Sequence, residues 1–189
     1  MLNNFDICIN TRFIFGKGAE KQIGEILKKD GVKKVLIHHD NGQYLYDTGL
    51  LQAVCDQLTA NGIAHAELGG VLPNPRLSLV REGIELAKRE GIDLVLAIGG
   101  IDSAKAIGLG TVSEGDVWDY FIGEREPEHT LPVAVLLTCP ATGSESSQVA
   151  VVNNTDEGKK LLVSHPVLRP KYAFMDPELT YSLPKFLTA

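Results

Sequence analysis

The sequence has few cysteines, and the three that it has, Cys8, Cys55 and Cys139, lack the spacing of a metal-binding motif. An odd count without a pairing pattern argues against a disulfide-stapled secreted domain and favours a reducing compartment. The simplest interpretation of each thiol is a small buried hydrophobic side chain. The N-terminus also lacks a basic region followed by an apolar core, so no signal peptide is predicted. We therefore expect a cytoplasmic protein.

Long apolar runs and clusters of positive charge are missing as well. No apolar run approaches the roughly 20 residues that span a bilayer, so we expect no membrane segment. The formal net charge is -6 and no run of lysine and arginine offsets it, which makes nucleic acid a poor partner. A nucleotide cofactor stays compatible with this charge, because backbone dipoles bind phosphate. None of the five histidines pairs with a carboxylate at helical spacing, so local spacing predicts no metal site.

What the sequence does contain is a regular alternation of apolar strands and amphipathic helices. Continuous apolar strands are typical of a sheet whose two faces are both covered by helices, and this alternation predicts an α/β fold with a mainly parallel sheet. The 189 residues suffice for one domain or one lobe of a larger protein. We predict a hairpin or two edge strands at 5–15, strands at 32–39, 63–68, 93–98, 133–137, 149–153, 161–164 and 172–175, and helices at 19–29, 45–60, 77–90 and 102–109.

Ligands of such sheets bind beyond the carboxyl ends of the strands. Asp40 follows a buried strand directly, and a carboxylate there can accept both hydroxyls of an adenosine ribose. That role favours NAD over NADP, because a 2′-phosphate would be repelled. An aspartate beside Asn41-Gly42 is equally typical of a turn, and its position alone does not decide between the two interpretations.

The strongest local signal is a buried strand that passes through Gly99-Gly100 into a helix N-terminus. This geometry places backbone N–H groups and the positive end of a helix dipole in front of a phosphate. Taken alone, Asp102 is typical of a helix cap.

A polar loop, Thr138–Glu145, follows the next strand. Its neutral donors suit a pyrophosphate or a nicotinamide ribose, but the loop is also compatible with a surface turn that satisfies its own backbone. No nearby histidine is placed to activate Cys139, so a nucleophilic role is not expected.

Together these loops resemble the iron-containing (group III) alcohol dehydrogenases. The resemblance runs over essentially the whole chain and is specific in the order and spacing of its segments. Such enzymes have an N-terminal Rossmann-like domain, shared with dehydroquinate synthase, and a C-terminal helical domain that holds a divalent metal, iron or zinc. The resemblance therefore implies a nucleotide-binding α/β domain over residues 1–189 and reversible hydride transfer between NAD or NADP and a small primary alcohol or aldehyde. The matching segments are Phe13–Gly18, Val71–Pro75, Ala97–Ile107, Thr138–Glu145 and Ala173–Thr180.

The resemblance also implies a role for nine residues in binding the cofactor. Some would hold the phosphates, others the two riboses, the adenine or the nicotinamide. They are Asp40 at the adenosine ribose, Asn74 in the cleft, Gly99 and Gly100 with Asp102 at the pyrophosphate, Thr138, Cys139 and Thr142 along the adenine and nicotinamide side, and Lys160 at the nicotinamide ribose.

Two departures from the family pattern affect this expectation. The family's phosphate loop reads Gly-Gly-Gly-Ser-x-x-Asp, whereas here Ile101-Asp102 follows Gly100 at once, so three residues are missing. Fewer N–H donors remain, and we expect weakened cofactor binding. The family's metal ligands, one aspartate and three histidines, lie downstream of the segment that matches Leu183–Ala189. We therefore expect no catalytic residue, no metal ligand and no helical metal domain in this chain, and no activity of the chain alone.

Two other hypotheses remain. The chain could be a non-catalytic product of truncation that serves as a binding or oligomerisation module, or it could belong to the related glycerol dehydrogenase or dehydroquinate synthase branch. The segments Val71–Pro75 and Asp176–Thr180 favour the alcohol dehydrogenases. We expect a homo-oligomer, because the resemblance implies a dimer surface at Phe5–Phe15, and loss of a helical domain would expose apolar surface near Val163–Leu168 and Tyr181–Leu187.

Overall fold

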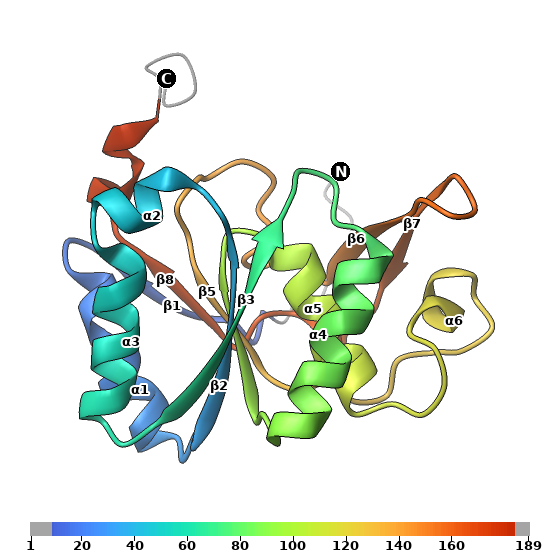
Figure 1. Cartoon of the computed structure of the whole chain (residues 1–189), viewed down its shortest axis with the longest axis horizontal. Helices are drawn as coiled ribbons and strands as arrows, with labels where there is room; N and C mark the ends of the chain where they lie inside the picture. Colours follow the sequence, from blue (N-terminus) through green and yellow to red (C-terminus); the bar gives the residue numbers. More distant parts are fainter. Residues whose placement is uncertain (1–8, 184–189) are drawn as a thin grey trace, which may run out of the picture.

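A six-stranded parallel sheet forms the centre of the computed structural model, which describes residues 9–183 (Figure 1). All neighbouring strands in this sheet run parallel, in the order β1-β8-β5-β4-β2-β3, so the predicted mainly parallel α/β fold is confirmed. A separate antiparallel pair, β6 and β7, lies outside it. The strands are β1 (Arg12–Phe15), β2 (Lys34–Asp40), β3 (Ala64–Val71), β4 (Leu94–Ile98), β5 (Val133–Leu136), β6 (Val149–Asn154), β7 (Lys159–Ser164) and β8 (Tyr172–Met175).

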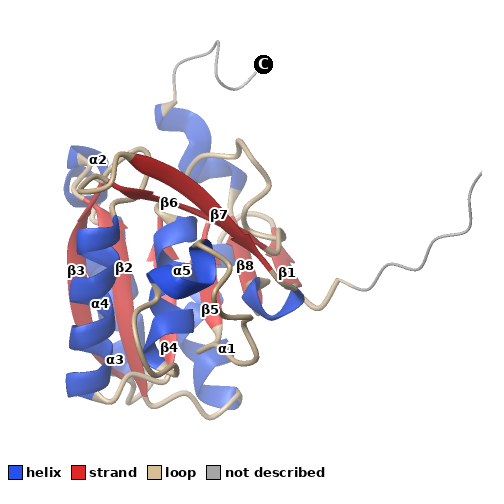
Figure 2. Ribbon diagram, turned by 90° about the vertical axis from the view of Figure 1, so that its right-hand side faces the viewer, coloured by secondary structure: helices blue, strands red, loops and turns tan. Residues whose placement is uncertain are grey.

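Helices cover both faces of the sheet. Figure 1 shows α1, α2 and α3 on one side of the strands and α4 and α5 on the other. The β6–β7 pair packs against α5, as Figure 2 shows from the side. The helices are α1 (Ile23–Lys29), α2 (Gln43–Asp47), α3 (Leu50–Ala60), α4 (Leu77–Glu90), α5 (Ile101–Thr111) and α6 (Trp118–Phe121), with 3-10 turns η1 (Ala19–Gln22), η2 (Pro166–Leu168) and η3 (Pro177–Ser182).

Two hydrophobic cores form because side chains alternate between the two faces of each strand. On β2, Val35 and Ile37 pack in the core beneath α1 and α3, whereas Leu36 packs in the core beneath α4 and α5. The strand β4 is buried along its full length, as expected for a strand covered on both faces.

The strand order places a topological switch point between β2 and β4. The connection through α3 carries the chain from β2 outward to β3, whereas the connection through α5 carries it from β4 in the opposite direction to β5. The loops that follow β2 and β4 therefore part at the carboxyl edge of the sheet. Open α/β sheets bind their ligands in this kind of crevice.

One predicted element was wrong in detail, and another is described only in part. Of the segment 5–15, predicted as a hairpin or two edge strands, the structure describes one edge strand, Arg12–Phe15, which pairs with β8; residues 5–8 lie outside the described part. The helix predicted over 45–60 is divided into α2 and α3, because Gly49 adopts φ 69°, a left-handed conformation that interrupts a helix.

Predictions about exposed and buried groups had mixed outcomes. The segment Val163–Leu168, predicted to be exposed in part, has buried ends at Val163 and Leu168 and an exposed Pro166 between them. Tyr181 is exposed as predicted, and residues 184–187 lie outside the described part. Cys55 is buried as predicted, but Cys139 is exposed, and Cys8 is not described. Within residues 9–183, no helix combines the length and the apolar character needed to cross a membrane.

Candidate functional site

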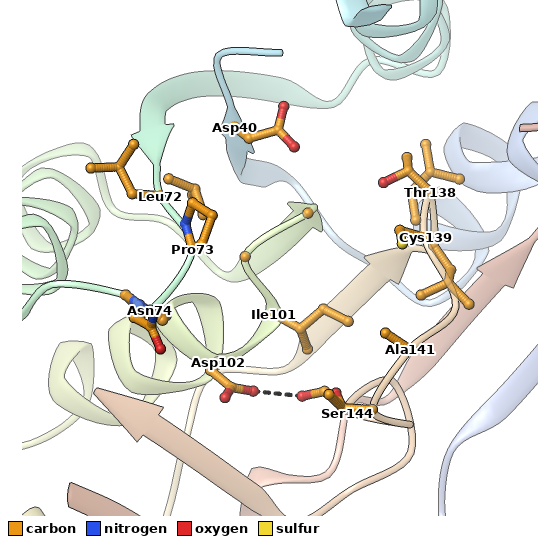
Figure 3. Close-up of a pocket in the computed structure, with 17 residues that line it drawn as sticks. Asp40, Leu72, Pro73, Asn74, Ile101, Asp102, Thr138, Cys139, Ala141 and Ser144 are labelled. Carbon is orange, nitrogen blue, oxygen red and sulfur yellow. Dashed lines mark hydrogen bonds between the residues drawn. The ribbon is translucent and has the colours of Figure 1, made fainter. Parts of the chain in front are cut away.

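A cavity of about 500 Å³ opens at the carboxyl edge of the sheet, at the switch point between β2 and β4 (Figure 3). Its walls come from the loops that follow β2, β3, β4 and β5. The structure brings eight of the nine residues predicted to bind a cofactor to this one cavity. These eight are Asp40, Asn74, Gly99, Gly100, Asp102, Thr138, Cys139 and Thr142.

The glycine turn after β4 lines this cavity. Gly99 and Gly100 have φ values of 75° and 61°, in the left-handed region that glycine adopts without strain. A Cβ atom on Gly100 would approach Cγ1 of Val71 to 2.6 Å, so the turn also needs glycine for space. Gly100 is the residue before α5, and the first turn of a helix has N–H groups without intrahelical acceptors. The turn therefore presents backbone donors to an anion in the cavity.

Asp40 closes a turn, as one of its two interpretations predicted, and it also lines the cavity. Its Oδ1 accepts a hydrogen bond from the Gly42 N–H at 2.8 Å. Its Oδ2 accepts from the Tyr44 hydroxyl at 3.2 Å, and that hydroxyl also lies 3.3 Å from Oγ1 of Thr138. Burial raises the pKa of Tyr44 to about 12, so the phenol keeps its proton. Tyr44, which the sequence analysis missed, therefore links the loops after β2 and β5.

Asn74 and Lys160 are brought together although 86 residues separate them. Asn74 is the one non-glycine residue of the described chain with positive φ, 62°, and it lies between two prolines. The Lys160 ammonium donates to its side-chain oxygen at 2.5 Å. Lys160 is the predicted residue that does not line the cavity itself, and its contact with Asn74 places it beside the rim.

Asp102 in the first turn of α5 binds the polar loop that follows β5. One carboxylate oxygen accepts from the Ser144 hydroxyl at 2.6 Å, the bond drawn in Figure 3, and the other accepts from the Val151 N–H at 3.1 Å. Both oxygens are thus occupied within the protein. Asp102 accordingly shapes the cavity wall by holding Ser144 and β6 against α5.

The comparison with known families shows to which family the chain with this cavity belongs. Residues 10–177 match the family described as iron-containing alcohol dehydrogenase. The chain belongs to this family. It spans about half the length of the curated relatives that it matches.

Individual relatives agree with this assignment. The chain is 41% identical over 189 residues to NADH-dependent butanol dehydrogenase A of Clostridium acetobutylicum, covering 98% of this chain and 48% of the relative. A crystal structure of NADH-dependent butanol dehydrogenase A from Thermotoga maritima superposes with a TM-score of 0.93 at 41% identity, covering 98% of this chain and 47% of that one. Sulfoacetaldehyde reductase from Bifidobacterium kashiwanohense, solved in complex with NAD+, gives a TM-score of 0.89 at 28% identity, covering 100% and 50%.

The glycine turn between β4 and α5 is short in the structure as well as in the sequence. Ile101 begins α5 directly after Gly100, so the turn adds no further residues between the strand and the helix. A Cβ atom on Gly99 would lie 2.9 Å from Oδ2 of Asp40, which shows how close this carboxylate comes to the turn. An anion at the turn would meet few donors, with the carboxylates of Asp40 and Asp102 in the lining of the same cavity.

The cavity does not fit the divalent metal that the family name implies. Among the described residues that line the cavity there is no histidine. The hydrogen bonds of Asp40 and Asp102 tie protein loops together, and the cavity lining offers no imidazole beside either carboxylate. We therefore derive no catalytic step through a metal at these residues.

A buried lysine, also missed by the sequence analysis, anchors the loop after β5 to α5. Lys105 is fully buried, and its ammonium donates to Oγ of Ser144 at 3.0 Å and to the carbonyl oxygens of Ser147 and Val149, each at 2.9 Å. A lysine within the apolar helix segment Ala104–Ile107 was the signal available in the sequence, because a charged residue is rarely buried unless it has partners.

The Lys105 ammonium predicts a specific pH dependence of stability. Burial lowers its pKa from 10.5 to about 8. Between these two values the unfolded chain binds more protons than the folded protein, so the free energy of unfolding rises with pH through this window. The slope from Lys105 is at most about 1.4 kcal/mol per pH unit. Urea denaturation of the wild type and of Lys105→Met at pH 7.5, 8.5 and 9.5 isolates the contribution of Lys105 to the slope. Parallel pH profiles of the free energy of unfolding for the two proteins would contradict this contribution.

A second buried polar contact ties β2 to α5. His38 is fully buried, with Nδ1 3.0 Å from the Leu68 carbonyl oxygen and Nε2 2.7 Å from the Ser103 hydroxyl. Burial lowers the pKa of His38 to about 4, so the ring is neutral at pH 7. A carbonyl oxygen only accepts, hence Nδ1 carries the proton of the neutral ring, and Nε2 faces the Ser103 hydroxyl, whose oxygen also lies 2.8 Å from the Gly100 carbonyl oxygen. This contact fixes the helix that bears the glycine turn against the sheet.

Proposed function

We propose that this chain is the dinucleotide-holding part of an alcohol dehydrogenase that transfers hydride reversibly between NAD(H) and a small primary alcohol or aldehyde. The observation that carries the proposal is the convergence of eight predicted cofactor residues from four loops on one cavity at the switch point. Two relatives named as NADH-dependent butanol dehydrogenases and one solved with NAD+ support it.

In this proposal each part of the cavity binds a defined part of the cofactor. Gly99, Gly100 and the N-terminus of α5 hold the pyrophosphate through backbone N–H groups. Asp40 accepts the hydroxyls of the adenosine ribose, and this carboxylate repels a 2′-phosphate, which favours NAD over NADP. Lys160, steadied by Asn74, reaches the nicotinamide ribose. Thr138, Cys139 and Thr142 form the wall along the adenine and nicotinamide.

The role of Asp40 is tested by NADH and NADPH titrations of Asp40→Ser. We expect NADH affinity to fall about tenfold, because a hydrogen bond to a charged group contributes about 1.5–3 kcal/mol. We expect NADPH affinity to rise relative to NADH. The control is Asp47→Ser, an exposed aspartate seven residues further on that does not line the cavity. If wild-type chain leaves NADH fluorescence unchanged at millimolar concentration, the cofactor role itself is wrong.

The proposal also includes the absence of catalysis by the cavity residues alone. When bound, a divalent metal in this family would polarise the oxygen of the alcohol, but the described residues at the cavity do not hold one. We propose that the 189-residue chain binds the cofactor without turning over substrate. An assay with NADH, butanal and Zn²⁺ or Fe²⁺ should give no oxidation of NADH above background; measurable turnover would refute this part.

We also propose that the protein is cytoplasmic and forms a homo-oligomer. The side chains of Phe13 and Phe15 on the edge strand β1 are 47% and 74% exposed, and β1 has no partner on its outer side within the described sheet. Exposed apolar groups on an open strand edge favour pairing with another copy. Light scattering at high protein concentration should therefore report an oligomer.

A further inference from the structure

Three side chains with metal-binding chemistry meet between α3 and β3, although no two of them are joined by a recognisable sequence motif. One ligand atom each from Cys55, His65 and Glu67 lies within 4.8 Å of the others. His65 and Glu67 are two residues apart on β3, so both point to the same face of the sheet. Cys55 approaches from α3, with its sulfur 3.7 Å from Oε1 of Glu67. The cluster is therefore created by the packing of a helix on an edge strand.

A buried histidine on the neighbouring strand borders this cluster. His39 is 4% exposed, and its Nδ1 lies 2.5 Å from the carbonyl oxygen of Asp40. Because a carbonyl oxygen only accepts, Nδ1 carries the proton of the neutral ring and Nε2 has a lone pair. Nε2 faces Oε2 of Glu67 at 3.9 Å. His39 therefore adds a second imidazole at the border of the cluster, next to Glu67.

We propose that Cys55, His65 and Glu67 bind one Zn²⁺ ion, with a water molecule in the fourth position and His39 beside it. One sulfur, one nitrogen and one oxygen ligand suit zinc, whereas Mg²⁺ and Ca²⁺ require oxygen ligands. Three protein ligands with one open position are typical of zinc sites that keep a water molecule. This inference does not depend on the proposed cofactor function.

The protonation of the thiol is consistent with this site. Burial, followed by the charge of Glu67, raises the pKa of Cys55 to about 11, so without a cation the thiol keeps its proton. Zinc binds the thiolate, hence the ion replaces this proton and one proton is released to solvent. The charge that opposes ionisation of the thiol, the Glu67 carboxylate, becomes a ligand of the same ion.

The test uses the 189-residue chain with Cys8→Ala and Cys139→Ala, which leaves Cys55 as its one thiol. After removal of metal by a chelator, calorimetric titration with Zn²⁺ should give one ion per chain. Titration with Co²⁺ should give a thiolate-to-cobalt charge-transfer band in the near ultraviolet. Zinc should also raise the melting temperature, because it binds only the folded state.

Variants of the three ligands decide the outcome. Cys55→Ala should abolish the cobalt band, and Glu67→Gln and His65→Gln should each weaken zinc binding at least about tenfold. Glu67 is exposed, so Glu67→Gln keeps the fold and remains informative if Cys55→Ala is unstable. The matched control is Glu82→Gln on α4, also exposed, which should bind zinc like the parent. Absence of zinc binding to the parent, or equal affinity in the parent and Glu67→Gln, would overturn the proposal.

Discussion

Replacing Lys105 by alanine is expected to lower the free energy of unfolding by about 3 kcal/mol. The substitution leaves the carbonyl oxygens of Ser147 and Val149, two half-buried residues, without the Lys105 donor, and an unsatisfied polar group away from water costs about 1–3 kcal/mol. It also opens a cavity in the core. The substitution also removes the cost of burying the Lys105 ammonium, which is stabilising. We expect the loss of the donor to two carbonyl oxygens to be the larger effect. Urea denaturation at pH 7 measures the difference.

Two further variants separate the causes of this effect. Lys105→Met keeps the volume but strands the same carbonyl oxygens, so it should still cost about 2 kcal/mol. Lys160→Ala removes an exposed lysine and should change the free energy of unfolding by less than about 0.5 kcal/mol. If Lys105→Ala and Lys160→Ala are equally stable, Lys105 does not anchor the loop after β5.

Inserting Gly-Ser-Ala between Gly100 and Ile101 is expected to tighten NADH binding about 10- to 100-fold. The three residues restore the length of the family's phosphate loop and add backbone N–H donors where the present turn passes straight into α5. One hydrogen bond to a charged group contributes about 1.5–3 kcal/mol, and 1.4 kcal/mol corresponds to a tenfold change in affinity. Fluorescence titration with NADH measures the dissociation constants of both proteins.

The control for this prediction is a Gly-Gly-Ser insertion after Glu128, in the exposed loop before β5, which should leave NADH affinity unchanged. Circular dichroism must show that both insertion variants are folded. A wild-type dissociation constant in the low micromolar range that the insertion after Gly100 does not improve would show that the short turn is no handicap.

Much of the fold could be predicted from local patterns. The helix α4 has the predicted bounds, Leu77–Glu90, because its apolar stripe and terminal Gly91 are both local signals. The strands β2, β4 and β5 were predicted because burial on both faces gives continuous apolar runs. Errors arose where tertiary pairing decides: β3 continues to Val71, beyond the predicted end at Leu68, through pairing with β2.

The candidate site was predicted in part for the same reason. Glycines that follow a buried strand are a local signal, and Gly99-Gly100 lies where the sequence analysis placed it. Tyr44 and Lys105 were missed because the contacts that join them to the loop after β5 span long stretches of sequence. Tyr44 and Thr138 are 94 residues apart, and Lys105 and Ser144 are 39 residues apart. The cofactor roles of the nine predicted residues stay predictions until binding is measured.

The pairing of β1 with β8 has a consequence for synthesis on the ribosome. β8 lies between β5 and β1 in the sheet, and Arg12 pairs with Tyr172, about 160 residues later. At about 5–20 residues per second, β1 leaves the ribosome about 8–30 s before the strand that holds it. The nascent protein can therefore assemble β5-β4-β2-β3 first. The strand β1, although synthesised first, stays unpaired until β8 has been made.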